Sequence, residues 1–130
     1  MSHHRRTITA DNAPAAVGPY SHAVVSNGLV FCSGQIPLDP ASGELVGFTA
    51  ADQARQCLTN LEAVCAAAGA KLTDAVRITV WLTDMNDFVA VNEVYEGFFD
   101  DEPPARVAIA VHALPKGAVV EIDAIVAMPD

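Results

Sequence analysis

Apolar and polar positions near the start of the chain follow the two-residue period of β-strands. Residues 20–26 and 29–33 form two short runs rich in β-branched and aromatic residues. Asn27-Gly28 joins them, and this dipeptide favours the left-handed backbone of a two-residue hairpin turn. We therefore expect the chain to open with a hairpin. Residues 37–43 then form a turn-rich connection to a short extended piece around residues 44–46.

From residue 49 to residue 68 the apolar positions recur with the period of an α-helix. Thr49 is a good N-cap residue, and Gly69 can adopt the left-handed conformation that ends many helices. We expect a helix between these two caps that buries one apolar stripe. The stripe consists of Ala54, Leu58, Leu61, Val64, Cys65 and Ala68.

Residues 75–82 return to strand-like alternation. We expect one face of this strand to lie in the core and the other face to be wet or to form an interface. The first face carries Val76, Ile78, Val80 and Leu82, and the second carries Arg77, Thr79 and Trp81.

A second helix is predicted to begin near Asp84, with Asp87 three residues later as a capping partner, and to run to Phe99. Two further strands are expected at residues 107–112 and 118–127, with a turn at residues 114–117. The inward residues of the second helix are Phe88, Val91, Tyr95 and Phe98, and Asn92 lies beside them.

In chain order these elements are a hairpin, a helix, a strand, a helix and a hairpin. This order predicts an α+β fold in which two helices pack on one face of a mixed β-sheet. In the last strand Val120, Ile122, Ala124 and Val126 would face the helices, and Val119, Glu121, Asp123 and Ile125 would point the other way. A sheet face that is half apolar and half charged suits a subunit interface with a polar pocket in it.

The 130 residues fit one compact domain that spans residues 1–130, with residues 1–6 as a flexible tail. Hydrophobic residues make up 52% of the chain, which is more apolar surface than a small monomer hides easily, so we expect an oligomer. The uncharged apolar stretches end well before the roughly 20 residues of a membrane span, and the start has no apolar leader. These features indicate a cytoplasmic protein with no membrane segment.

The formal net charge of −9 limits which ligands the protein can bind. An acidic protein repels RNA and DNA, so the charge argues against a nucleic-acid partner. One arginine can still hold a small anion, because salt screens distant charges over about 8 Å. The three cysteines have no C-x-x-C spacing and fit reduced core residues, and the four histidines form no metal-binding set. We expect no metal.

Several short blocks of the sequence closely resemble the RidA (YjgF) family, in the family's order and over about residues 7–127. The resemblance implies a chorismate-mutase-like α+β fold and a homotrimer whose sheets face a central barrel, with three clefts between subunits. It also implies hydrolysis of small imino acid substrates, such as 2-aminoacrylate and 2-iminobutanoate, to 2-oxo acids and ammonia. The blocks are Gly18-Pro19-Tyr20, residues 33–40, Asn86-Asp87-Phe88 through Val91-Asn92 to Tyr95, Pro104-Ala105-Arg106, Leu114-Pro115-Lys116 and Glu121.

Arg106 is the expected anchor for the substrate. A 2-imino acid carries a carboxylate next to its electrophilic carbon, and a guanidinium fork can hold this carboxylate by two parallel hydrogen bonds. The resemblance implies that Arg106 is the carboxylate-binding arginine of the family. From the residues alone, a surface arginine at the start of a strand remains an alternative.

Glu121 is the expected catalytic carboxylate. Hydrolysis needs a water molecule aimed at the imine carbon, and a nearby carboxylate can orient this water and relay a proton. The alternative is a strand glutamate paired with Arg77 or Lys116. Because the imine carbon is already activated, the reaction needs no covalent nucleophile, metal or other cofactor.

The resemblance also implies substrate-binding residues around these two. Many relatives have an aromatic residue, a serine or threonine, and a cysteine where this chain has Pro103, Val107 and Ala108, and the segment at residues 100–103 is shorter here. A main-chain carbonyl at the cysteine position would be retained, but the missing aromatic residue and the shorter segment predict a side-chain pocket of different size. The implied substrate-binding residues are Tyr20, Ser33, Gly34, Asn92, Arg106 and Ala108.

Three functions from different classes stay open at this point. The presence of both Arg106 and Glu121 favours an imine deaminase. A non-catalytic trimer that binds small carboxylates or acts as a chaperone is the alternative suggested by the altered positions near Val107. Ribonuclease or translation inhibition, an activity attributed to some relatives, is opposed by the acidic balance and by the lack of a histidine pair or basic stripe.

Overall fold

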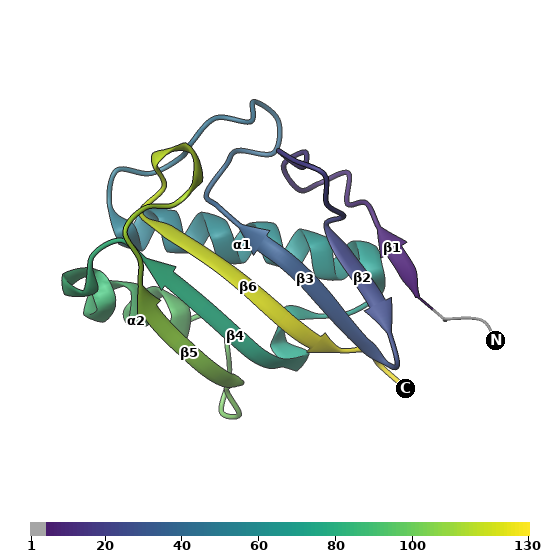
Figure 1. The fold of residues 1–130 in the computed structure, drawn as a ribbon. Coiled ribbons are helices and arrows are strands. Elements are labelled where there is room, and N and C mark those ends of the chain that lie inside the picture. Colours follow the sequence, from purple (N-terminus) through teal and green to yellow (C-terminus); the bar gives the residue numbers. More distant parts are fainter. Residues whose placement is uncertain (1–4) are drawn as a thin grey trace.

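The last strand in the chain, β6 (Val120–Ala127), lies at the centre of a six-stranded mixed sheet. The structure is a computed structural model that describes residues 5–130 (Figure 1). The remaining strands are β1 (Arg6–Ile8), β2 (Ala23–Ser26), β3 (Leu29–Gln35), β4 (Ala75–Leu82) and β5 (Ala105–Ala110). The strand order is β1-β2-β3-β6-β4-β5; β4 and β5 are parallel, and the other neighbours are antiparallel.

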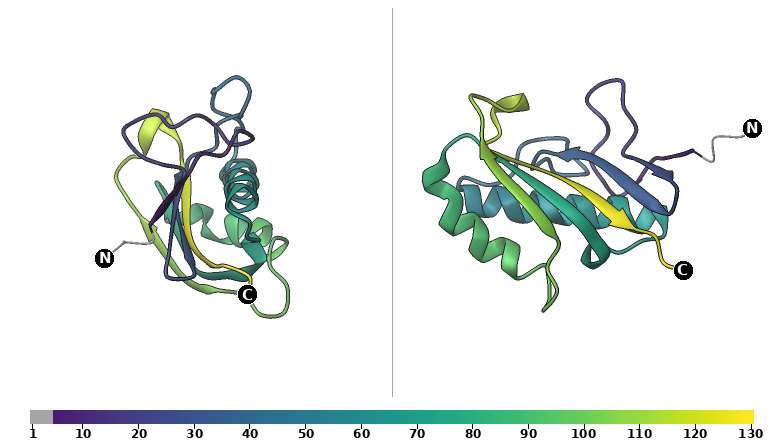
Figure 2. Two further views of the ribbon diagram at one scale, coloured as in Figure 1. Left: turned by 90° about the vertical axis from the view of Figure 1, so that its right-hand side faces the viewer. Right: turned by 60° about the horizontal axis from the view of Figure 1, so that its bottom comes forward.

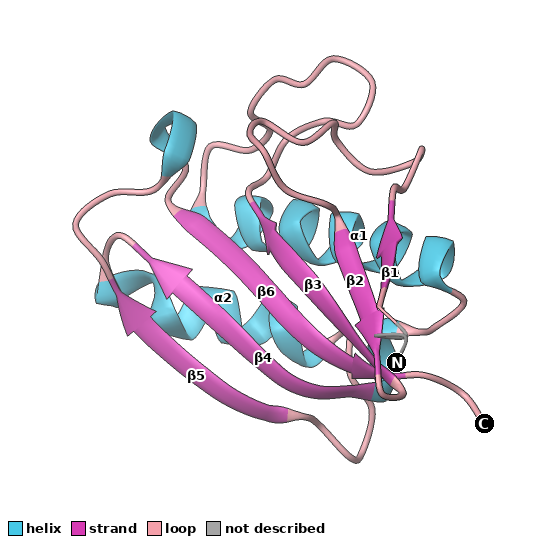
Figure 3. Cartoon of the chain, turned by 45° about the vertical axis from the view of Figure 1, so that its right-hand side comes forward, coloured by secondary structure: helices cyan, strands magenta, loops and turns pink. Residues whose placement is uncertain are grey.

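Both helices, α1 (Ala50–Ala68) and α2 (Phe88–Glu96), cover the same face of the sheet (Figures 2 and 3). The predicted α+β arrangement with two helices on one face of a mixed sheet is therefore confirmed. We call the uncovered side the open face. It exposes large apolar side chains, among them Phe31 and Ile109, each 44% exposed. None of the helices within residues 5–130 is long and apolar enough to cross a membrane.

The predicted hairpin is present as β2 and β3, and Asn27 and Gly28 turn it with φ values of 53° and 76°. It is not the first element, because β1 precedes it and pairs with β2. Arg6 therefore belongs to a strand rather than to a tail, and the burial of Ile8 holds this strand on the core. Residues 1–4 of the expected tail lie outside the described residues.

Helix α1 begins and ends as the sequence predicts. The Thr49 side chain accepts a hydrogen bond from the backbone N–H of Asp52 (3.1 Å), and Gly69 adopts φ 84° at the C-terminal end. The whole predicted apolar stripe is buried against the sheet, and so are all three cysteines. Burial raises the pKa of the Cys57 thiol.

The second helix is shorter than predicted. Residues Met85–Asp87 form a 3₁₀ turn (η2), because the Asp84 side chain accepts from the backbone N–H of Asn86 (2.9 Å) and tightens the chain there. Regular α-helix runs only from Phe88 to Glu96, so Phe98 and Phe99 pack against the core from beyond the helix.

Two expectations about strands are wrong in detail. Val76 is 49% exposed instead of inward, because the pairing of β4 with β6 shifts register between Ala75 and Arg77. The last two strands do not form a hairpin. Strand β5 is exposed along most of its length and pairs only with β4 at the sheet edge, whereas β6, buried at every second residue, is inserted between β3 and β4.

Candidate active site

Glu121 lines a cavity of about 290 Å³ on the open face of the sheet. The side chain of Glu121 belongs to the half-buried row of β6 that faces away from the helices, as predicted. The other residues that line the cavity come from the segment before β2, from the end of β3 and from the turn before β6. They are Val17, Tyr20, Ser33, Gly34, Ile36 and Pro115. Together with Glu121, three of these, Tyr20, Ser33 and Gly34, are predicted site residues.

Ser33 and Gly34 lie in an irregular part of β3. The pairing with β6 is regular up to Cys32 and resumes at Gln35 one residue out of step, which is a β-bulge. Glycine at this position allows a close approach: a Cβ added to residue 34 would lie 3.0 Å from Cδ of Glu121 and would overlap its carboxylate. The bulge and the missing side chain together bring the backbone of β3 against the Glu121 carboxyl group.

The half-buried position of Glu121 changes its acidity. Burial raises the pKa of this carboxyl, and the charge of Asp123 raises it further. Asp123 itself accepts a hydrogen bond from Nε1 of Trp81 (2.9 Å). Residue Arg77 lies opposite Ile125, not opposite Glu121, so the strand register does not favour the alternative of a Glu121–Arg77 pair.

Two hydroxyl groups in the same cavity keep part of their hydrogen-bonding capacity. The backbone N–H of Val17 donates to the Tyr20 hydroxyl (3.2 Å), which leaves the phenol proton free to be donated. The Ser33 hydroxyl donates to the carbonyl of Ser21 (2.6 Å), so its oxygen can still accept. The cavity can thus offer a ligand one donor, one acceptor and a carboxyl group.

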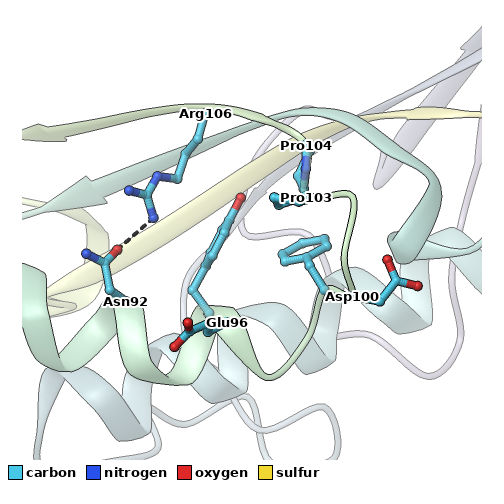
Figure 4. A pocket seen from close by; sticks show the side chains of 8 residues that line it. Asn92, Glu96, Asp100, Pro103, Pro104 and Arg106 are labelled. Atoms are coloured by element: carbon cyan, nitrogen blue, oxygen red, sulfur yellow. Dashed lines mark hydrogen bonds between the residues drawn. The ribbon is translucent and has the colours of Figure 1, made fainter.

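Arg106 lies in a second, larger groove of about 640 Å³ between α2 and β5 (Figure 4). Its Nη1 donates to Oδ1 of Asn92 (2.7 Å), and its Cζ lies 4.9 Å from the ring centroid of Tyr95 and 5.4 Å from that of Phe88. Burial raises the pKa of Tyr95, and the nearby Arg106 charge acts in the opposite direction. The remaining lining residues are Glu96, Phe99, Asp100, Pro103 and Pro104.

Ala108, the last of the predicted site residues, lines neither cavity. It pairs with Val80 in β4, and its side chain packs against the core. Because β5 is an edge strand, the main-chain groups on its outer side have no strand partner within the described chain. A role for Ala108 through its main-chain carbonyl therefore stays a prediction.

Arg106 and Glu121 are not brought together within one chain. In the sheet, Arg106 lies beside Ile78 and Glu121 beside Trp81, three positions apart and with β4 between their strands. Strand spacing and rise then give a Cα separation of about 14 Å. Arg106 also turns toward α2, whereas Glu121 lies on the open face.

Some supporting residues were not anticipated from the sequence. Gln53 and Asn60 are polar, buried and seven residues apart on the inner side of α1. Oε1 of Gln53 accepts from the backbone N–H of Val119 (2.8 Å), and Nδ2 of Asn60 donates to the carbonyl of Leu38 (3.0 Å). A polar residue within the apolar stripe of a helix is the sequence signal that could have revealed these two side chains, which hydrogen-bond to backbone groups outside the helix.

Fold and site together define a small α+β protein that presents an arginine and a carboxyl on separate surfaces of one sheet. The family model described as Endoribonuclease L-PSP matches residues 10–128. The chain belongs to this family, the RidA (YjgF) family, as its sequence motifs predicted.

Individual relatives cover almost the whole chain. The RutC family protein y4sK of Sinorhizobium fredii is 51% identical over 93% of this chain and 96% of its own. The goat protein named 2-iminobutanoate/2-iminopropanoate deaminase is 50% identical over 93% of this chain and 88% of its own. The crystal structure of RidA from an Antarctic Psychrobacter superposes with a TM-score of 0.90 at 48% identity, covering 95% of this chain and 99% of the other.

Proposed function

We propose that the protein is an enamine and imine deaminase that hydrolyses 2-aminoacrylate and small 2-imino acids to 2-oxo acids and ammonia. Relatives about half identical to it carry the name 2-iminobutanoate/2-iminopropanoate deaminase. The observation that carries the proposal is that one fold presents both chemical groups that the reaction needs. Arg106 has a guanidinium suited to a carboxylate, and Glu121 has a half-buried carboxyl suited to activating water.

Arg106 holds the substrate carboxylate in this mechanism. A guanidinium has five N–H donors, and within residues 5–130 Arg106 makes one hydrogen bond, to Asn92. Two parallel N–H groups remain for both oxygens of a carboxylate. This arrangement fixes the adjacent imine carbon in position without any contact to the substrate side chain.

Glu121 orients the attacking water and takes its proton. A carboxyl whose pKa is raised by burial is a stronger base than an exposed one and can pass the proton on to the leaving nitrogen. Tyr20 and Ser33 supply a donor and an acceptor beside it, and Gly34 leaves room for the Glu121 carboxyl group at the bulge. Ala108 contributes through the main-chain edge of β5, which has no strand partner among the described residues.

The active unit is a homotrimer with a chorismate-mutase-like arrangement, in which the open sheet faces point inward. Two observations support a site shared between copies. The open face exposes apolar residues such as Phe31 and Ile109, which a neighbouring copy would cover. One small substrate cannot bridge Arg106 and Glu121 of the same chain, so Arg106 of one copy and Glu121 of the next act together.

The test is to measure release of ammonia and 2-oxo acid from freshly generated 2-aminoacrylate, with and without the protein. We expect acceleration that is lost in Arg106→Ala and kept in Arg55→Ala, which removes an exposed arginine of α1 outside both cavities. Light scattering on the same samples should give the mass of three chains. A single-stranded RNA is included because the family description names an endoribonuclease. Binding of a 2-oxo acid without hydrolysis, or cleavage of RNA alone, would contradict the proposal.

A further inference from the structure

The guanidinium of Arg106 rests on three side chains from one face of α2. Asn92 accepts its hydrogen bond, and the rings of Tyr95 and Phe88 lie 4.9 and 5.4 Å from Cζ. Positions 88, 92 and 95 are spaced by four and three residues, so they form one row along the helix. The sequence spacing on α2 therefore builds a support directed at a single side chain on β5.

Arg106 needs such a support because of where it lies. It is an exposed residue on an edge strand, and its long side chain has several rotatable bonds. An unsupported arginine in this position would lose conformational freedom each time it bound a carboxylate. Contacts that exist before binding remove part of this loss.

The aromatic rings support the guanidinium without consuming its donors. A cation lies over the face of a ring, whereas a carboxylate neighbour would accept the same N–H groups that a ligand needs. Glu96 and Asp100 line the same groove, yet no hydrogen bond joins either of them to Arg106 within the described residues. The N–H groups of the Arg106 guanidinium therefore stay available to a ligand.

Tyr95 is the more deeply buried of the two rings. It is 7% exposed, and its centroid lies 4.8 Å from that of Phe99. Phe88 is half-buried and packs against the same core. The support is therefore part of the packed helix layer and does not depend on a mobile surface side chain.

We propose that Tyr95, assisted by Phe88, is a positioning residue that holds the Arg106 guanidinium in the orientation required to bind the carboxylate of the ligand. This inference rests on the proposed function only for the identity of the ligand, a 2-imino or 2-oxo acid. Tyr95 acts through Arg106 and makes no contact with the reacting atoms. Its ring, and not its hydroxyl, is the part that matters.

The experiment compares Tyr95→Leu, which removes the ring, with Tyr95→Phe, which keeps it. Affinity for 2-oxobutanoate is measured by calorimetry, and kcat and KM are measured for imine hydrolysis. We expect Tyr95→Leu to weaken binding and raise KM by about 5- to 10-fold, the size of a partly desolvated cation–π contact, with little change in kcat. Tyr95→Phe should restore most of the affinity. Phe98→Leu is the matched control, because Phe98 packs against the core without lining the groove.

The same substitution in a second protein background shows whether Tyr95 acts by positioning Arg106 or only by packing in the core. In an Arg106→Ala protein, Tyr95→Leu should cause no further loss of affinity, because the side chain that it positions is absent. The inference is overturned if Tyr95→Leu binds as wild type does, if its effect persists in the Arg106→Ala background, or if Tyr95→Phe is as impaired as Tyr95→Leu. Should wild type bind 2-oxobutanoate but not hydrolyse imines, the proposed function fails while the binding comparison still tests Tyr95.

Discussion

Replacing Gly34 with alanine should move the Glu121 carboxyl group without unfolding the protein. The new Cβ would lie 3.0 Å from Cδ and 3.3 Å from Cγ of Glu121 and closer still to its carboxylate. Ordinary contacts between carbon atoms are about 3.5–4.0 Å, so the end of the glutamate side chain must move by about 1 Å. The backbone at residue 34 does not need a positive φ, so alanine fits the chain itself.

The expected effect is large for catalysis and small for stability. A 1 Å displacement of a catalytic group can lower the rate by about 10²-fold. The displaced group is the end of a flexible side chain, so the free energy of unfolding should change by no more than about 1 kcal/mol. The assay is steady-state hydrolysis of a freshly generated 2-imino acid, together with thermal unfolding of the same sample.

The control is the same substitution in a protein that already carries Glu121→Ala. With Glu121→Ala the three atoms closest to the new Cβ are gone, so Gly34→Ala should add little to the loss of activity. Wild-type kcat in a folded Gly34→Ala protein would refute the catalytic role of Glu121. An additional large loss in the Glu121→Ala background would show that Gly34 acts in another way.

Three further substitutions test the same site. Glu121→Gln should lower kcat by about 10²-fold and abolish the rise of kcat with pH, which in wild type follows ionisation of Glu121 at its raised pKa. The same raised pKa means that the contribution of Glu121 to stability is present below pH 4.5 and is lost as the pH rises. In denaturant titrations, the free energy of unfolding of Glu121→Gln should therefore increase relative to that of wild type as the pH rises toward neutral. Arg106→Lys keeps the charge but loses the planar fork, and we expect kcat/KM to fall at least about tenfold; wild-type kinetics would rule out carboxylate binding by Arg106. Tyr95→Phe removes a buried hydroxyl that has no hydrogen-bond partner within the described residues, so the free energy of unfolding should rise by about 1 kcal/mol, and a lower melting temperature would disprove this.

The sequence predicted the local elements well because their signals are local. Thr49 and Gly69 mark the ends of α1, and Asn27-Gly28 marks the hairpin turn, so no distant contact is needed to recognise them. The pairing of β5 with β4 in parallel depends on contacts between residues about 28 positions apart, such as Arg77 with Ala105. Turn residues between two strands suggested a hairpin there, but the deeply buried β6 took the central position instead.

The candidate site was also predicted only in part from the sequence. The motif blocks identified residues that the fold does group, with Tyr20, Ser33, Gly34 and Glu121 in one cavity and Asn92 with Arg106 in the other. The alternation in the last strand correctly placed Glu121 on the face away from the helices, but no pattern along the chain indicated that Arg106 turns toward α2 on the other side. The β-bulge at Ser33 and Gly34 was equally invisible, because a bulge is defined by a partner strand that lies almost 90 residues away.

The central place of β6 has a consequence for how the chain acquires its structure during synthesis. Translation delivers β3 and β4 long before β6, so both strands first exist with a free edge where β6 will later lie. Until residues Val120–Ala127 emerge, the sheet consists of two separate halves and α1 has no continuous surface to cover. The nascent chain therefore cannot close its core stepwise, and shortened chains that lack β6 should be prone to strand-to-strand aggregation.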